Sequence, residues 1–135
     1  MSDNTAGMLA PGLTGEVSLR VDEVHTAAAL GSGNVRAFST PALIALLEGA
    51  AVAALQGHLP AGQTSVGTHL DVRHLAATPV GMTVRATARL VEVDGRRLIF
   101  AVEAHDEVEQ IGAGTHERFV VDKARFEARV AAKGG

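Results

Sequence analysis

Residues Ser39–Leu55 read STPALIALLEGAAVAAL, and this stretch decides the fold. It opens with helix-start chemistry, because the hydroxyl of Thr40 stands at the cap position and Pro41, which has no amide proton to lose, follows it. From there to Leu55 nearly every residue is Ala, Leu, Ile or Val, which predicts a helix that is apolar, and therefore buried, on all sides. Its one charge, Glu48, needs a partner or a proton, since removing an unpaired carboxylate from water is costly.

The composition limits the class of protein. A chain of 135 residues fits one domain with a real core. The formal net charge is only -3 and the basic residues are scattered, so nucleic acid is not an expected partner. Cysteine is absent, which removes disulfide and thiol chemistry, while the six histidines keep a metal site conceivable.

Targeting and membrane segments are not expected. The first twelve residues carry no basic segment that leads into an apolar one, so we expect no signal peptide. The helix that begins at Pro41 is too short, and too interrupted by Glu48 and Gly49, to span a bilayer. The simplest interpretation is a soluble cytoplasmic protein without a membrane partner.

Hydrophobic alternation predicts the remaining elements. We expect a flexible N-terminal segment over residues 1–14 and a single domain over residues 15–133. Strands are predicted at 15–24, 64–76, 82–93, 96–106 and 111–121, with a hairpin turn at Asp94-Gly95. Residues 25–38 are predicted to be a loop before the helix, and residues 122–133 a short amphipathic helix.

The order of these elements predicts the fold class. One strand and one buried helix are followed by four strands that are mostly linked by hairpins, so a doubly wound parallel sheet is not expected. A helix that must be covered all round favours an α+β fold, in which a curved antiparallel sheet of about five strands wraps around one long central helix. We expect a second copy of the chain to complete the outer sheet edge, as a homodimer.

Glu48 and His74 form the first candidate site. In the alternation of residues 64–76, His74 lies on the same face as Val66, Val72 and Leu70, so it and the helix carboxylate can share one interior region. A carboxylate beside an imidazole is a general base or an orienting pair. An equally weighted alternative is that Glu48 pairs with an arginine or caps a loop amide, and that His74 is a satisfied core histidine.

Thr40 is the second candidate. The simpler interpretation is that its hydroxyl caps the helix, and the functional one is that the positive helix end polarises a carbonyl with Thr40 beside it. Thr40 and Glu48 lie about 12 Å apart along a regular helix, so within one chain they cannot touch. Thr40 must therefore act across a bound substrate, from the neighbouring subunit, or only as a cap.

Other polar residues carry weaker signals. Gly112 and Gly114 in one strand indicate a bulge or a close approach of a ligand or backbone. Arg118 could meet a phosphate or a carboxylate, or be a solvated strand charge. The alternating His69, Asp71 and Arg73 favour a surface ladder over a metal site, because only one of them is a histidine.

Several of these pieces together resemble a known family. They are Ser39-Thr40 followed by Glu48, Val66-Gly67-Thr68, His74-Leu75-Ala76-Ala77-Thr78-Pro79, Gly95-Arg96-Arg97, and Gly112-Ala113-Gly114-Thr115-His116-Glu117-Arg118. In order and spacing they are similar to the hot-dog-fold thioesterases of the fluoroacetyl-CoA thioesterase type. The similarity covers roughly residues 38–130 and is weak before Phe38.

The resemblance implies a sheet curled around one long helix, a homodimer with active sites at the subunit interface, and hydrolysis of an acyl-CoA without a cofactor or metal. It implies that Thr40, Glu48 and His74 are the catalytic residues, and that Gly67 and Arg118 contact the substrate. Members specialised for fluoroacetyl-CoA carry an aromatic-rich lid before the threonine. In residues 29–38 the only aromatic residue is Phe38, which we expect on the substrate side. The lack of other aromatic residues in this segment argues against a fluorinated substrate.

Three functions follow as hypotheses. The main one is acyl-CoA thioester hydrolysis, in which Glu48, oriented or balanced by His74, activates water or attacks the carbonyl while Thr40 and nearby amides stabilise the oxyanion. The second is a hot-dog module that binds an acyl-CoA or acyl group without cleaving it. The least favoured is an enoyl-CoA hydratase, since such enzymes place Asp and His five residues apart and the helix has no such pair. Pairing of dimers into a higher oligomer stays open.

Overall fold

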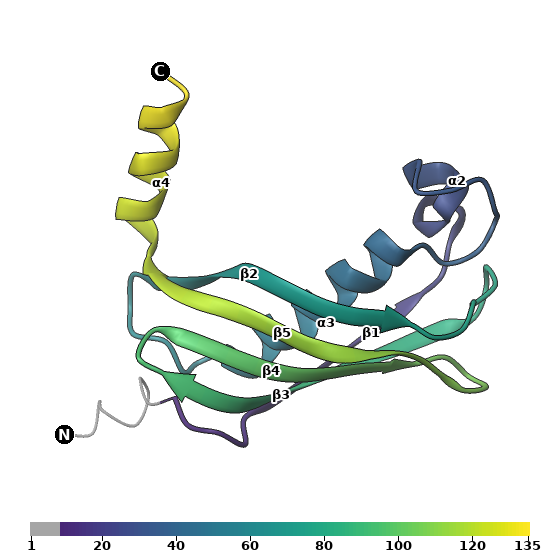
Figure 1. Cartoon of the computed structure of the whole chain (residues 1–135), viewed down its shortest axis with the longest axis horizontal. Helices are drawn as coiled ribbons and strands as arrows, with labels where there is room; N and C mark the ends of the chain where they lie inside the picture. Colours follow the sequence, from purple (N-terminus) through teal and green to yellow (C-terminus); the bar gives the residue numbers. More distant parts are fainter. Residues whose placement is uncertain (1–8) are drawn as a thin grey trace.

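The computed structural model describes residues 9–135, and in it a five-stranded antiparallel sheet packs against one long helix (Figure 1). The elements in chain order are β1 (Thr14–Arg20), the 3₁₀ turn η1 (Glu23–His25), α2 (Ala27–Leu30), α3 (Thr40–Leu55), β2 (Gln63–His74), β3 (Thr83–Asp94), β4 (Arg97–His105), β5 (Gln110–Asp122) and α4 (Lys123–Lys133). The predicted α+β fold with a curved sheet and one long helix is confirmed.

The strands lie in the order β1-β3-β4-β5-β2, and all neighbours are antiparallel. β3, β4 and β5 follow one another through hairpins, as the sequence predicts. The two-residue loop between β3 and β4 is Gly95-Arg96, one residue later than expected, and Gly95 has a φ of +61° that glycine adopts without strain. β1 and β2 are therefore the two edges of the described sheet.

Small residues let α3 lie close to the sheet. A Cβ on Gly15 of β1 would overlap backbone atoms of Ala50 and Ala54. Because the buried residues on that part of the helix are alanines, strand and helix backbones come into near contact. The core is completed by side chains from the helix and the inner faces of the strands, among them Leu43, Leu47, Val84, Leu90, Leu98, Phe100 and Ile111.

The prediction that α3 is buried on every side is wrong for the single chain. Ala45 and Val52 are exposed, with Val52 at 45%, and Glu48 and Gly49 between them are half-buried. These positions recur with helical spacing and so form one stripe. One side of an otherwise apolar helix is therefore left open.

The segments before α3 also differ from the prediction. β1 ends at Arg20 rather than at residue 24, and the expected loop contains the short helix α2. Thr26 caps α2, and isolated bridges join Thr26 to Phe38 and Ala37 to Pro79. These contacts are long-range in sequence, which explains why the local pattern did not reveal them.

The predicted flexible segment 1–14 is only partly described, because residues 1–8 lie outside the described residues. In residues 9–14, the amide of Gly12 donates a hydrogen bond to the carbonyl of Leu90, and the amide of Leu90 donates one to the carbonyl of Leu13, both at 2.8 Å. At the other end, α4 begins at Lys123, close to the predicted position, and extends away from the sheet (Figure 1).

Candidate active site

Thr40 meets His74 at the start of α3. The Thr40 hydroxyl lies 2.8 Å from Nδ1 of His74, the last residue of β2. Thr40 is not the helix cap, which corrects the simpler interpretation above. Ser39 takes that place, and its hydroxyl accepts a hydrogen bond from the Ala42 amide at 3.1 Å. The Thr40 hydroxyl is thus free for another use.

The environment of His74 favours a neutral imidazole. Burial lowers the pKa of His74 below its ordinary value of 6.5, because the charged ring loses water. A neutral ring can accept the Thr40 proton at Nδ1 if its own proton is on Nε2. Nε2 is buried and has no hydrogen-bond partner among residues 9–135. The contact fits both neutral tautomers, because Nδ1 accepts from the Thr40 hydroxyl when Nε2 carries the proton and donates to the Thr40 oxygen when Nδ1 carries it.

Glu48 belongs to a second cluster, with Arg118 of β5. Its Oε2 lies 3.4 Å from Arg118 Nη1, which makes an ion pair in which the arginine is buried and the carboxylate side chain is 37% exposed. Arg118 also bonds to Ser65 of β2, whose hydroxyl accepts from Nε at 2.8 Å and whose carbonyl accepts from Nη2 at 3.0 Å. Burial lowers the pKa of Arg118, while Glu48 opposes that shift. Arg118 is thus not a solvated strand charge.

Gly67 makes room for the Glu48 carboxylate. A Cβ at this position would overlap Glu48 Oε2 and would lie 3.2 Å from the His116 ring and 3.4 Å from Arg118 Nη1. Only glycine lets strand β2 pass this cluster without displacing it. Gly67 therefore supports the carboxylate, whatever further contact it makes with substrate.

A bulge in β2 brings Gly67 to this face. The pairing of β2 with β5 shifts between Gly67 and His69, so the alternation of the strand reverses there. Gly67 and His74, which the sequence pattern placed on opposite faces, consequently both face the helix side. The predicted face assignment for the first half of this strand is wrong for that reason.

The predicted Glu48–His74 pair is not formed within the chain. Glu48 pairs with Arg118 and His74 with Thr40, which is the arginine alternative noted for Glu48. Gly67 and His74 are seven residues apart on β2, which corresponds to about 23 Å of strand. The described chain thus holds the three predicted catalytic residues in two separate clusters.

A cavity of about 530 Å³ opens at the Thr40–His74 pair. Its wall is formed by the loop before α3 and by the residues that follow β2: Ala27, Ser32, Gly33, Asn34, Val35, Ala37, Phe38, Ser39, Thr40, His74, Leu75, Ala76 and Ala77. Phe38 is among them, although it is only 3% exposed and packs into the core. The lining is small and mainly apolar, which suits an acyl group.

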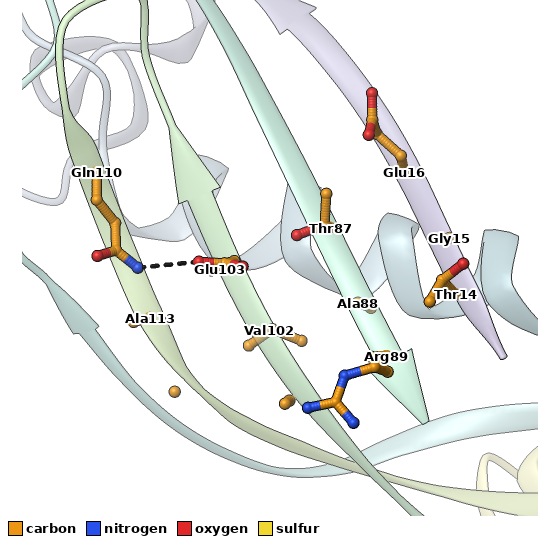
Figure 2. Close-up of a pocket in the computed structure, with 12 residues that line it drawn as sticks. Thr14, Gly15, Glu16, Thr87, Ala88, Arg89, Val102, Glu103, Gln110 and Ala113 are labelled. Carbon is orange, nitrogen blue, oxygen red and sulfur yellow. Dashed lines mark hydrogen bonds between the residues drawn. The ribbon is translucent and has the colours of Figure 1, made fainter. Parts of the chain in front are cut away.

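A larger hollow of about 690 Å³ lies on the sheet face that turns away from α3 (Figure 2). Glu16, Thr87, Arg89, Glu103 and Gln110 line it, and a hydrogen bond of 3.2 Å joins Gln110 to Glu103. No histidine and neither candidate cluster contributes to it. Its size does not make it the reactive site, because it lacks a base and a nucleophile in contact.

Sequence reasoning missed Ser65 and gave no role to His116. Both contact Arg118, and His116 Nε2 lies 3.0 Å from Arg118 Nη1. The spacing of His116 and Arg118 by two residues in a strand could have indicated a shared face. Among residues 9–135, no group of His, Cys, Asp or Glu could hold a metal ion, and no helix is long and apolar enough to cross a membrane.

Comparisons with known proteins identify the family of the chain. Residues 21–124 match the family model described as fluoroacetyl-CoA-specific thioesterase. Over 96 residues, 71% of this chain and 69% of the relative, the chain is 48% identical to the fluoroacetyl-CoA thioesterase of Streptantibioticus cattleyicolor. This chain belongs to the fluoroacetyl-CoA-specific thioesterase family.

Solved structures of this thioesterase family confirm the fold. A mutant of the fluoroacetyl-CoA enzyme FlK in complex with acetyl-CoA is 37% identical, with 94% of this chain and 100% of that chain covered and a TM-score of 0.89. A hot-dog-like protein from Thermanaerovibrio acidaminovorans is 27% identical, with 100% and 98% covered and a TM-score of 0.85. The predictions of a hot-dog fold and of a thioester hydrolase are confirmed at the level of the family.

Proposed function

We propose that this chain hydrolyses an acyl-CoA thioester to the free acid and coenzyme A at the cavity beside Thr40 and His74. The observation that carries the proposal is the 2.8 Å contact between the Thr40 hydroxyl and His74 Nδ1, with the helix capped by Ser39 instead. Because the Thr40 hydroxyl is not used as a helix cap and is held by a neutral imidazole, it is suited to hydrogen-bond the carbonyl oxygen of a bound thioester. The comparison with the family supports the reaction class.

The helix start supplies the electrostatic part of the mechanism. Thr40 is the first residue of α3, so a thioester carbonyl at the cavity mouth lies near the Thr40 amide and the positive end of the helix. As the carbonyl is attacked, its oxygen gains negative charge, which the positive helix end and the Thr40 amide stabilise. The Thr40 hydroxyl donates to the same oxygen when Nδ1 of the neutral His74 ring carries the proton and donates to the Thr40 oxygen. His74 orients that hydroxyl.

Glu48 supplies the base or the nucleophile. In one route it takes a proton from water, the water oxygen bonds to the carbonyl carbon, and the C–S bond breaks as the protonated Glu48 returns the proton to the leaving thiolate of coenzyme A. In the other, Glu48 itself attacks the carbonyl and the C–S bond breaks to release coenzyme A. Water then cleaves the resulting anhydride to the free acid and restores the carboxylate. Arg118, with Nη1 3.4 Å from Oε2, holds the carboxylate in place for either route.

Because Glu48 and the Thr40–His74 pair are separate within the chain, we infer that two subunits build each site. β2 is an open edge of the described sheet, and its Leu70 is 36% exposed. The apolar stripe of α3 that contains Val52 is also uncovered. An unpaired strand edge beside an open apolar face is suited to a second copy of the chain.

The spacing on β2 specifies how that copy would lie. If two β2 edges pair antiparallel about a twofold axis between Leu70 and Asp71, His74 lies beside Gly67 of the partner subunit. The Thr40–His74 pair then faces Glu48 of the partner subunit, which rests against Gly67. A dimer of this kind contains two such sites. Pairing of dimers into a larger oligomer and a cytoplasmic location stay predictions.

The experiment is a thiol-release assay on short, branched, aromatic, fluorinated and long acyl-CoAs. We expect release of coenzyme A with at least one of them, and a loss of at least about 100-fold in Glu48→Gln, because a carboxamide can neither take the proton nor attack. His74→Ala should also lose activity. Glu103→Gln, on the opposite face of the sheet, is the matched control.

Two outcomes would contradict the proposal. Near-wild-type hydrolysis by Glu48→Gln across the panel would remove the role of Glu48. Saturable acyl-CoA binding with no thiol release from the wild type would instead support the alternative of a non-catalytic acyl-CoA binding module.

A further inference from the structure

His116 of β5 is a fully buried polar residue next to the Glu48–Arg118 ion pair. Its exposed fraction is 0%, and it lies two residues before Arg118 on the same side of the strand. The ring of Phe100 packs beside it with centroids 6.3 Å apart. A buried imidazole needs partners for both ring nitrogens, since an unmet buried polar group is costly.

The carbonyl of His69 fixes which nitrogen of His116 carries the proton. Nδ1 lies 2.9 Å from this oxygen, and a carbonyl can only accept a hydrogen bond, so Nδ1 must be protonated. His69 directly follows the bulge in β2, so the position of its carbonyl is set by that irregularity. The backbone of β2 therefore selects the tautomer of a side chain on β5.

In the neutral ring, Nε2 then carries a lone pair. It lies 3.0 Å from Arg118 Nη1, which has only protons to offer, so Nε2 accepts a hydrogen bond from the guanidinium. Burial, reinforced by the Arg118 charge, lowers the pKa of His116 and keeps the ring neutral. Glu48 Oε2 is farther away, at 3.9 Å from Nε2.

The other donors of Arg118 are also engaged. Four of its five N–H groups have acceptors, namely His116, Glu48 and the hydroxyl and carbonyl of Ser65. Nη1 carries two protons, and because one is bound by His116, the other is directed at Glu48. Without an acceptor at His116 Nε2, the planar guanidinium as a whole could turn or shift away from the carboxylate.

We propose that His116 is a positioning residue, which accepts a hydrogen bond from Arg118 at Nε2 and so fixes the guanidinium against Glu48. The role rests on the proposed function, because Glu48 is the group that acts on the thioester. His116 itself touches neither substrate nor reacting atoms. Its contribution is to the geometry of Glu48 and thus to kcat rather than to substrate binding.

Two substitutions separate the two ring nitrogens. His116→Gln places an amide oxygen near the Nε2 position and can still accept from Arg118, while His116→Asn places its amide group near Nδ1 and keeps only the bond to His69. We expect His116→Asn to lower kcat at least about tenfold, with KM changed less than about threefold, because it removes a hydrogen bond to a charged group. His116→Gln should restore most of kcat. His105→Asn, at the end of β4, is the histidine control.

A spectroscopic measurement tests the contact without any activity. Nitrogen NMR of histidine-labelled protein at neutral pH should show His116 as the Nδ1–H tautomer, and its Nε2 resonance should move in Arg118→Met. Thermal unfolding of each variant verifies that it is folded. A wild type that cleaves no acyl-CoA would refute the proposed function yet leave this result readable.

Three results would overturn the inference. They are an Nε2–H tautomer, an unmoved Nε2 resonance in Arg118→Met, and equal losses of kcat in folded His116→Asn and His116→Gln. The last result would mean that His116 acts by its shape in the core.

Discussion

The Thr40 hydroxyl lies 2.8 Å from His74 Nδ1 and makes no cap to the helix that Thr40 begins. Capping and polar chemistry are thus divided between two adjacent hydroxyl residues, Ser39 and Thr40. Their effects on stability and on rate should therefore separate.

Ser39→Ala should lower stability, whereas Thr40→Ala should lower the rate. Ser39→Ala removes the cap and is expected to lower the free energy of unfolding by about 1 kcal/mol. Thr40→Ala should leave stability nearly unchanged but reduce kcat at least about tenfold, and Thr40→Ser should recover part of it. Chemical denaturation and thiol-release kinetics measure both quantities. A Thr40→Ala protein that is destabilised but as fast as the wild type would contradict the assignment.

Gly67→Ala should damage the Glu48 cluster. The added methyl group would overlap Glu48 Oε2, so either the carboxylate or strand β2 must move. We expect a loss of about 1–3 kcal/mol in the free energy of unfolding from overpacking, together with a fall in kcat. Gly134→Ala is the matched control, since a Cβ at residue 134 would make only ordinary contacts and the backbone there has a negative φ that alanine adopts without strain. Unchanged rate and stability would show that Glu48 does not depend on this glycine.

Mixing two inactive variants tests whether the site is shared between subunits. In a heterodimer of Thr40→Ala and Glu48→Gln, one site combines an intact Thr40 with an intact Glu48 from the partner subunit. Random exchange of equal amounts should restore about a quarter of wild-type activity, because half of the dimers then hold one good site of two. Co-refolded or co-expressed variants allow the assay. If both residues acted within one chain, no activity would return.

The reaction should slow on acidification as His74 gains a proton. Burial lowers the pKa of His74 below 6.5, so the neutral ring beside Thr40 persists at neutral pH and is lost only below that value. The acid limb of kcat/KM is therefore expected to have its midpoint below 6.5. The profile of the slower His74→Gln variant should lack this limb. A midpoint above 6.5 in the wild type would contradict the neutral buried ring.

Stability should follow the same direction. The pKa of His116 and that of His74 are both lowered by burial, so between the folded-state values and the unfolded value of 6.5 the unfolded chain binds more protons. The contribution of the two neutral histidines to the free energy of unfolding is complete above pH 6.5, and it is lost as the pH falls from 6.5 through the folded-state pKa values. The melting temperature should thus drop as the pH falls below 6.5, and less steeply in His116→Leu. An equal slope in that variant would exclude His116 as a source.

Local patterns predicted most of the fold. Alternating apolar residues located β3, β4 and β5 to within one residue at most ends, and Pro41 located the start of α3. These features depend on neighbours in sequence. The burial of α3 was overestimated, because an all-apolar sequence favours burial but does not show which sides of the helix the rest of the chain can cover, and the stripe with Val52 is left open.

The candidate site was predicted by residue type but not by contact. Thr40, Glu48, His74, Gly67 and Arg118 all lie in the two clusters, yet Glu48 and His74 do not meet within the chain. The strand phase placed His74 on the helix side, where it lies, but a phase does not say which part of the helix a side chain meets, and His74 meets Thr40 eight residues before Glu48. The face of Gly67 was missed because the β2 bulge, which depends on pairing with a strand about 50 residues later, breaks the alternation.

The bulge between Gly67 and His69 also makes the site sensitive to the length of β2 as well as to its residue types. Removing one residue there would restore regular alternation and turn Ser65 and Gly67 outward while His74 stayed inward. Glu48 would lose the space that Gly67 leaves for it, and Arg118 would lose its two acceptors on Ser65. His116 would lose its hydrogen bond to the His69 carbonyl, although none of these residues had been substituted. In relatives of this chain, a gap of one residue in this strand is therefore a stronger sign of altered chemistry than a conservative replacement in either cluster.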